Sequence, residues 1–236
     1  MRIPNIEEIA FNKLPESLKV WEEAIRAKIR LGYLAINDKG VAPAGSTKMT
    51  GHPDVPVDLV AEFPPSSNFN RSWHDCEVPI AQVNLGELPD GALSRGCPHT
   101  GMLWVFLDLS NEAWKARCLY DLREPSELTF IPAELPGQVM RFQPAQTLPW
   151  ATKTLFPEFY WDETERDAFN DFVAKASSHG DGYTCIFGGW NLPIQGDFEE
   201  SAKTFIAAFP NLEFGDCGVV YLHFINDEFV AYPTCA

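Results

Sequence analysis

The sequence predicts an α+β fold: antiparallel sheets built from an internally duplicated unit, with N-terminal and mid-chain helices packed on the sheets. Two apolar runs are the main reason. Residues 101–108 (GMLWVFLD) and 218–226 (GVVYLHFIN) share the order glycine, two apolar residues, aromatic, aliphatic. Each run follows a segment that begins with glycine and has proline five positions later: GHPDVP at 51–56 and GGWNLP at 188–193. Continuous apolar character predicts central strands buried on both faces.

The 236 residues suit one domain, 1–236, because a chain of this length buries enough surface to fold without disulfides or metals. The duplicated segments are expected at roughly 46–143 and 180–236. Residues 144–179 would join them as a proline- and aromatic-rich connector followed by a helix.

The N-terminal part predicts a helix of about four turns from Pro15, because apolar residues recur there at three- and four-residue spacing and Gly32 can end the helix. A short strand at 34–36 and a turn at 37–40 follow. Residues 79–85 alternate as a strand, with Ile80, Gln82 and Asn84 on one face. Residues 116–122, 128–131 and 139–142 predict an antiparallel meander.

The mid-chain helix is predicted from Asp162, which can cap it while Glu165 completes a capping box. Phe169, Phe172 and Val173 then form an apolar stripe, and Gly180 ends the helix. An amphipathic segment around 203–209 and a last strand from Gly218 complete the chain.

Charge is unevenly distributed. The net charge is −15; residues 1–123 hold 13 basic and 16 acidic residues, and residues 124–236 hold 5 and 17. Such a surface disfavours nucleic acid and anionic lipid, because phosphate binding needs Lys and Arg. It favours a basic protein partner. The alternative is that acidity serves only solubility.

The sequence contains no run of 18–20 apolar residues, and Glu7 and Glu8 stand where a signal peptide would be apolar. We therefore expect a cytoplasmic protein without a membrane partner. The six cysteines form no C-x-x-C pair, which favours buried reduced thiols.

No hydrolase, zinc-protease, phosphate-loop or dinucleotide motif is present, so no catalytic residue, cofactor or metal is assigned. His74 and Cys76, with Cys97 and His99, offer two thiols and two imidazoles, as zinc prefers. Their one-residue spacing is tighter than usual, and the alternative is that these loops never meet.

Acidic side chains are the better binding candidates. Several lie on the mid-chain helix away from its apolar stripe, and others flank it or form a second cluster near residue 200. The candidate partner-binding residues are Glu158, Asp162, Glu163, Asp167, Asp171, Asp197, Glu199 and Glu200. The alternative is an ordinary solvated surface.

Polar residues beside the two Gly-Pro segments define a possible cleft between the repeats. Glycine permits close backbone approach to a ligand there. The candidate cleft residues are His52, Gln82, Asn84, Trp190 and Gln195. The alternative is that they serve turn geometry and hydrogen bonding between strands.

Three stretches resemble the YwqG-like family, bacterial proteins largely of unknown function. They are TKMTGHP at 47–53, PIAQVNL with ELP and GMLWVF between 79 and 106, and GGWNLPIQ with GDCG between 188 and 218. Thr50 and Asn191 depart from the family's glycine and proline, and Ile186 lies near the place of a Lys often found there. The resemblance implies a duplicated α+β fold and, through relatives encoded beside toxins, an immunity role.

We therefore expect a non-enzymatic binding protein, an immunity protein that neutralises a basic toxin such as a nuclease through its acidic surface. The alternatives are a small-ligand-binding protein or enzyme that uses the inter-repeat cleft, and an oligomeric scaffold without a ligand.

Overall fold

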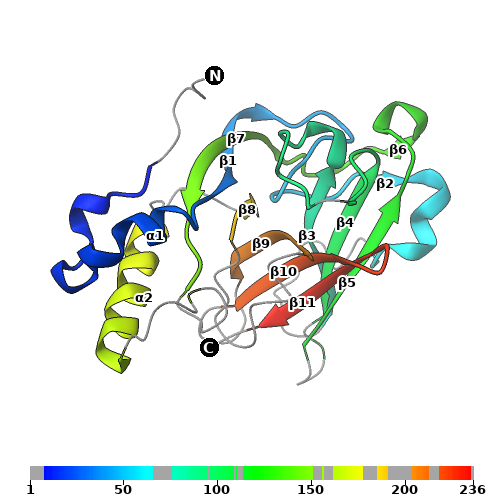
Figure 1. Ribbon diagram of the computed structural model, residues 1–236. Coiled ribbons are helices and arrows are strands. Elements are labelled where there is room, and N and C mark those ends of the chain that lie inside the picture. The colour runs from blue at the N-terminus through cyan, green and yellow to red at the C-terminus, as the bar shows by residue number, and fades with distance from the viewer. Residues whose placement is uncertain are drawn as a thin grey trace.

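Antiparallel strands dominate the computed structural model, with short helices at one end (Figure 1). The structure describes residues 8–65, 76–94, 96–108, 110, 114–150, 156, 162–177, 185–190, 204–212 and 218–234. Within these ranges the strands are β1 (Arg30–Val41), β2 (Val55–Pro56), β3 (Glu77–Asn84), β4 (Met102–Asp108), β5 (Lys115–Asp121), β6 (Phe130–Ile131), β7 (Gln138–Thr147), β8 (Cys185–Gly188), β9 (Phe205–Leu212), β10 (Gly218–Ile225) and β11 (Glu228–Thr234).

These strands form a six-stranded sheet in the order β11-β10-β9-β8-β1-β7, a three-stranded sheet β3-β4-β5 and a two-stranded sheet β2-β6. The described helices are α1 (Glu22–Arg26), α2 (Glu163–Ser177) and the 3₁₀ turns η1 (Phe11–Lys13), η2 (Glu16–Trp21), η3 (Val57–Glu62), η5 (Leu85–Glu87) and η6 (Pro125–Glu127). The general prediction of an α+β fold with antiparallel sheets is confirmed.

The main core lies between the six-stranded and three-stranded sheets. Alternate residues of β4, Leu103, Val105 and Leu107, point into it and meet side chains such as Phe187 of β8 and Leu222 of β10. The other residues of β4 enter a second cluster on its opposite face, so six consecutive side chains, 102–107, are fully buried. Each such burial contributes about 1.5–3 kcal/mol. The predicted central strand is confirmed.

The two similar apolar runs occupy similar places. The first forms β4, the middle strand of the meander β3-β4-β5, and the second forms β10, the middle strand of the meander β9-β10-β11. Like β4, β10 is buried on both faces, with Val220 and Leu222 in the main core and Val219 and Tyr221 in another cluster.

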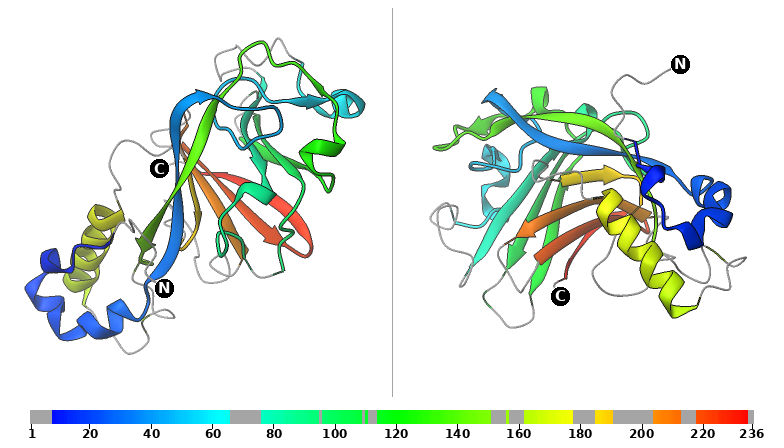
Figure 2. Two further views of the ribbon diagram at one scale, coloured as in Figure 1. Left: turned by 90° about the horizontal axis from the view of Figure 1, so that it is seen from above. Right: turned by 90° about the vertical axis from the view of Figure 1, so that its left-hand side faces the viewer.

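β1 and β7 form a long antiparallel ribbon that runs from the helical end toward β2 and β6 (Figure 2). The predicted strand at 34–36 is only the middle of the twelve-residue β1, and the predicted turn at 37–40 is wrong because those residues continue the strand. Pairing with β7 runs without interruption to Asn37↔Met140, shifts register over residues 38–40 and resumes at Val41↔Gln138, so pairing on both sides keeps these residues within the strand.

The meander predicted for residues 116–142 is also wrong. Its three strands, β5, β6 and β7, belong to three different sheets, pairing with β4, β2 and β1 respectively. Their spacing resembles a meander, but their partners come from far along the sequence. The connector expected from residue 144 begins later, because β7 continues to Thr147.

A bulge changes the faces of β3. The register shifts between Pro79 and Ala81, so Ile80 joins Ala81 and Val83 in the main core. The predicted sharing of one face by Ile80 and Gln82 is therefore wrong, because a bulge adds a residue and reverses the alternation beyond it.

The helices pack chiefly on one another at one end of the β1–β7 ribbon (Figures 1 and 2). Leu18 of η2 and Ile25 of α1 share a cluster with Phe169 and Val173 of α2, and Phe11 meets Phe172 with ring centroids 5.8 Å apart. The predicted four-turn N-terminal helix is shorter: it is a 3₁₀ turn followed by α1, which ends at Arg26. Packing of these helices across a sheet face is not confirmed.

At the opposite end, η3 and the β2–β6 pair cover the outer face of the three-stranded sheet (Figure 1). Phe63 packs edge-on against Trp104 and Phe106, with ring centroids 5.4 and 5.5 Å apart. Among the residues that the structure describes, no helix combines the length and apolar character needed to cross a membrane.

Candidate functional site

The segment before β2 lies across β3 and is fixed to it by backbone pairing. Lys48 and Gln82 form an antiparallel bridge, in which the Lys48 N–H donates to the Gln82 carbonyl at 2.8 Å and the Gln82 N–H donates back at 2.9 Å. On its other side, the His52 N–H donates to the Leu135 carbonyl at 2.7 Å and the Gln138 N–H donates to Thr50 Oγ1 at 3.1 Å. The sequence motif at 47–53 is therefore held between β3 and the start of β7.

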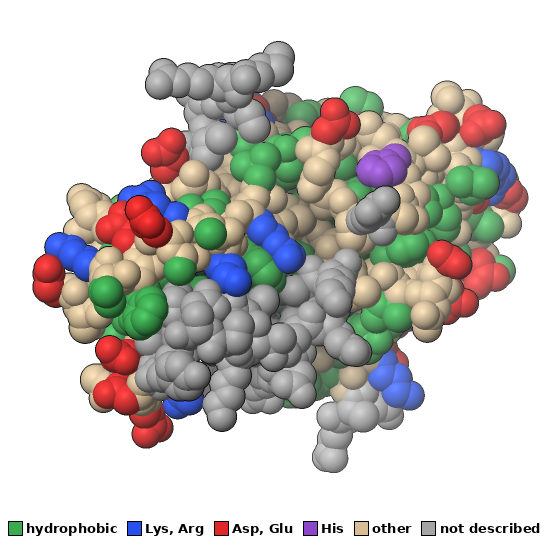
Figure 3. Space-filling view, in the orientation of Figure 1, with side chains coloured by type: hydrophobic (Ala, Val, Ile, Leu, Met, Phe, Trp, Pro, Cys, Tyr) green, Lys and Arg blue, Asp and Glu red, His purple; other side chains and the backbone are tan. Residues whose placement is uncertain are grey.

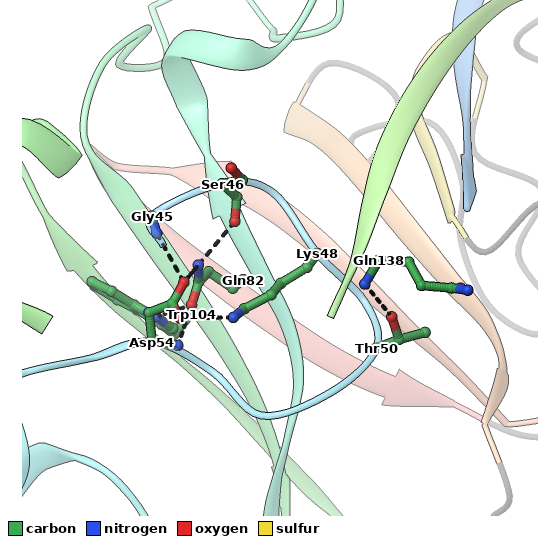
Figure 4. Close-up of polar contacts among 8 residues, drawn as sticks. All are labelled: Gly45, Ser46, Lys48, Thr50, Asp54, Gln82, Trp104 and Gln138. Atoms are coloured by element: carbon green, nitrogen blue, oxygen red, sulfur yellow. Dashed lines mark hydrogen bonds and ion pairs between the residues drawn. The ribbon is translucent and has the colours of Figure 1, made fainter. Parts of the chain in front are cut away.

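A buried ion pair joins two residues of this segment, Lys48 and Asp54 (Figure 4). Lys48 Nζ donates to Asp54 Oδ1 at 2.8 Å, and the two side chains are only 2% and 5% exposed. Asp54 Oδ2 accepts hydrogen bonds from the Gly45 N–H and from Gln82 Nε2, both at 2.8 Å. Both carboxylate oxygens are thus engaged, as a buried charge requires.

Gln82 connects the ion pair to the sheet. Its Oε1 accepts from the Asp54 N–H at 2.7 Å and from Trp104 Nε1 at 3.1 Å, while its Nε2 also donates to the Ser46 carbonyl at 2.8 Å. The side chain therefore makes four hydrogen bonds, as many as an amide group of this geometry readily satisfies. The hydrogen bonds of Gln82 therefore connect β3, β4 and residues 46–54.

Asn84, which lies on the same face of β3 as Gln82, also bonds to this segment. Its N–H donates to Thr47 Oγ1 at 3.0 Å, and Glu87 Oε2 accepts from the Thr47 N–H at 2.7 Å. The space between residues 48–53 and β3 measures about 20 Å³, which is room for about one water molecule. We call this arrangement of Lys48, Asp54, Gln82 and Asn84 the buried clamp, because it holds residues 47–54 against β3.

His52 lies at the edge of this clamp and also lines a larger groove of about 500 Å³. The groove is bordered by η3 with the following Phe63, and by Ile131 of β6 with the following residues as far as Glu134. Of the predicted cleft residues, His52, Gln82 and Asn84 are thus neighbours, but only His52 faces a space of ligand size among the described residues.

Trp190 lies in a different neighbourhood. Its N–H donates to Thr147 Oγ1 at 2.9 Å, its indole Nε1 donates to the Lys28 carbonyl at 2.5 Å, and the Arg30 guanidinium stacks 3.4 Å from its ring centroid. These contacts tie the end of β8 to the helical end of the molecule. The structure therefore does not bring Trp190 beside Gln82, and the fifth cleft residue, Gln195, lies outside the described residues.

The acidic residues on α2 face solvent, as predicted. Asp162, Glu163, Asp167 and Asp171 are exposed, whereas Phe169 is fully buried on the opposite side of the helix. The predicted capping box is confirmed: Asp162 Oδ1 accepts from the Glu165 N–H at 2.8 Å, and Glu165 Oε2 accepts from the Asp162 N–H at 3.3 Å. The other predicted acidic residues, Glu158, Asp197, Glu199 and Glu200, lie outside the described residues.

Counter-charges on α2 are few and loosely placed. Arg166 lies 3.8 Å from Glu163, and Lys175 lies 4.0 Å from Asp171, with both pairs exposed. Exposed pairs of this kind contribute at most about 1 kcal/mol, so the carboxylates can exchange these partners readily. Figure 3 shows acidic side chains at both ends of the visible face, including the end formed by α1 and α2.

Of the predicted zinc candidates, Cys76 and Cys97 are buried in the main core, His99 is exposed, and His74 lies outside the described residues. Burial raises the pKa of Cys97 to about 12, so the thiol stays protonated at neutral pH. The described residues contain no group of three or more His, Cys, Asp or Glu placed to hold a metal. The four described cysteines are free thiols.

Sequence reasoning did not single out the Lys48–Asp54 pair. Its one sequence signal is a Lys and an Asp six positions apart around a Gly-His-Pro turn, which brings their side chains to the same side. The pair is buried beneath Gln82 of β3 and Trp104 of β4, which follow Asp54 by 28 and 50 residues along the chain.

Comparison with known proteins returns no matching family model, and no curated protein matches the chain.

Proposed function

We propose that this chain is a cytoplasmic binding protein whose exposed acidic face on α2 recognises a basic protein, and that the partner is a toxin that it neutralises. The observation that carries the proposal is the set of exposed carboxylates on α2, of which Asp167 has no ion-pair partner among the described residues. Residues four positions apart lie on the same side of a helix, so Glu163, Asp167 and Asp171 share one exposed face of α2.

Charge complementarity supplies the physical link. A nuclease toxin must carry a basic cleft, because it binds phosphate. An acidic helix that covers such a cleft raises the association rate by steering and competes with the substrate for the same cations. The net charge of −15 extends this attraction beyond α2 itself.

The two meanders around β4 and β10 support internal duplication as the origin of the scaffold, and positive-φ glycines open both Gly-Pro segments, with φ of 72° at Gly51 and 64° at Gly188. We infer that the repeats give a rigid platform shared with the YwqG-like family, and that the acidic helix between them is the part specialised for binding.

Co-purification tests the proposal. The tagged chain, expressed with the product of the neighbouring open reading frame, should retain that product at low salt and lose it as salt rises. Co-expression should also protect cells from growth arrest by that product. Recovery of no complex, together with no protection, would contradict the proposal.

A second candidate function is the binding of a small ligand. It is favoured by one observation, the 500 Å³ groove that His52 lines. This groove differs from the inter-repeat cleft expected from the sequence, because Trp190 is not part of it.

A further inference from the structure

A groove of about 500 Å³ lies between η3 and the chain from Ile131 to Glu134. Figure 1 shows β6 at the end of the molecule away from α2. This volume falls within the range of about 300–1,000 Å³ typical of small-molecule sites. Its lining includes His52, Val60, Phe63, Pro65, Ile131 and Glu134.

The walls of this groove expose apolar surface. Val60 is 48% exposed and Ile131 is 43% exposed, and Val57 and Leu135 beside them are more than half exposed. Folding normally removes several such side chains from water when they lie together, and their exposure in one region is typical of a binding surface.

The floor of the groove is rigid. Phe63 is buried against Trp104 and Phe106 of β4, and the His52 backbone is held by the Leu135 carbonyl at 2.7 Å. Trp104 is in turn bonded to Gln82 of the buried clamp. The described floor of the groove is therefore already packed before an apolar group enters, which lowers the entropic penalty of binding.

The charged residues around the groove determine which charge a ligand's polar group should carry. Its described ionisable lining groups are His52 and Glu134, and no Lys or Arg is among them. Two described arginines near η3 are engaged elsewhere: Arg117 binds Glu77 at 2.6 Å, and Arg123 binds both Asp58 at 2.7 Å and Asp121. A positive group beside Glu134 thus meets a carboxylate without a competing cation from these residues.

We propose that this groove binds a small amphipathic amine, with the apolar body of the ligand against Val60, Phe63 and Ile131 and its ammonium group beside Glu134. The site is independent of the acidic face on α2, so failure of one proposal leaves the other standing.

Three probes of matched shape test the proposal by calorimetric titration of the full chain at low salt: 2-phenylethylamine, 2-phenylethanol and 3-phenylpropionate. The amine should bind about two- to fivefold more tightly than the alcohol, as expected for one exposed ion pair, and the carboxylate should bind most weakly. Glu134→Gln should abolish the preference for the amine and leave the affinity for the alcohol unchanged.

Val60→Asn should weaken all three probes, because it removes apolar contact area. Val20→Asn is its matched control, since Val20 is also an exposed valine in a 3₁₀ turn but lies in η2 at the helical end. Glu163→Gln on α2 is the matched control for charge. The proposal is overturned if no probe binds at millimolar concentration, if Glu134→Gln leaves the amine preference intact, or if Val60→Asn has no more effect than Val20→Asn.

Discussion

Carboxylates occupy two opposite environments in this protein. The side chain of Asp54 is 5% exposed, and its two oxygens accept hydrogen bonds from Lys48, Gly45 and Gln82. The side chain of Asp171 on α2 is 77% exposed, and Lys175 lies 4.0 Å from it. Both oxygens of the buried carboxylate are hydrogen-bonded within the chain. The exposed carboxylate is available to another molecule, as the proposed recognition of a basic partner requires.

Substitution of Asp54 should have the largest effect on stability. Asp54→Ala leaves the Lys48 ammonium buried without its carboxylate and removes the acceptor of the Gly45 N–H and Gln82 Nε2. We expect a loss of about 3–5 kcal/mol in the free energy of unfolding, measured by urea denaturation.

The double variant Lys48→Met, Asp54→Leu removes both charges together and should be more stable than Asp54→Ala alone. A loss below about 1 kcal/mol for Asp54→Ala, the level of an exposed pair, would mean that the buried pair does not hold the segment.

Gly51→Ala should be the next most damaging change. A Cβ atom at this position would lie 2.4 Å from the Leu135 carbonyl oxygen and 2.6 Å from the Gly137 nitrogen, and the backbone φ is 72°. We expect a loss of about 2–3 kcal/mol from overpacking and left-handed strain. Gly91→Ala is the matched control, because its φ is 85° but nothing lies within 4 Å. Equal losses for the two variants would argue against close packing at Gly51.

His223 provides a smaller effect that depends on pH. Its Nδ1 lies 3.1 Å from Thr204 Oγ1, between the rings of Phe205 and Tyr232. Burial lowers the pKa of His223 from 6.5 to about 4. Between these values the unfolded chain binds more protons, so the stability contributed by neutral His223 is complete above pH 6.5 and is lost as pH falls toward 4.

The melting temperature of the wild-type chain should therefore fall more steeply between pH 6.5 and pH 4 than that of His223→Phe, which keeps an aromatic ring but cannot titrate. Carboxylates titrate equally in both proteins, so the difference between the two slopes isolates the histidine. Parallel slopes would show that His223 is accessible to protons in the folded state.

Local patterns in the sequence were enough to predict the parts of the fold that depend on local chemistry. The continuous apolar runs gave β4 and β10, and Asp162 with Glu165 gave the start of α2. The outward direction of Asp167 and Asp171 followed from the helical period alone.

Features that depend on distant partners were missed. Residues 37–40 have turn-like composition but stay within β1 because β7 pairs with Asn37 and Val41 on either side of a register shift. The bulge between Pro79 and Ala81 reverses the side-chain pattern of β3. The groove at Val60 and Glu134 joins segments about 70 residues apart. No local pattern encodes such meetings, because they arise when the sheets pack.

Reversal of charge on α2 should have the smallest effect on stability. Among the described residues, Asp167→Lys with Asp171→Lys removes one ion pair, the 4.0 Å contact with Lys175, so the free energy of unfolding should change by no more than about 0.5 kcal/mol. Urea denaturation measures this. A larger loss would show that these residues stabilise the helix, and any effect on binding would then have a structural explanation.

The most direct test of the central claim is the association rate of this double variant with the co-purified partner as a function of salt. The variant should associate about tenfold more slowly at low salt, with a weaker salt dependence. Asp38→Lys with Glu228→Lys is the matched control, because it changes the net charge equally, from −15 to −11, at exposed positions on β1 and β11. If the α2 variant and this control associate at the same rate as the wild-type chain, the acidic face of α2 is not the binding surface.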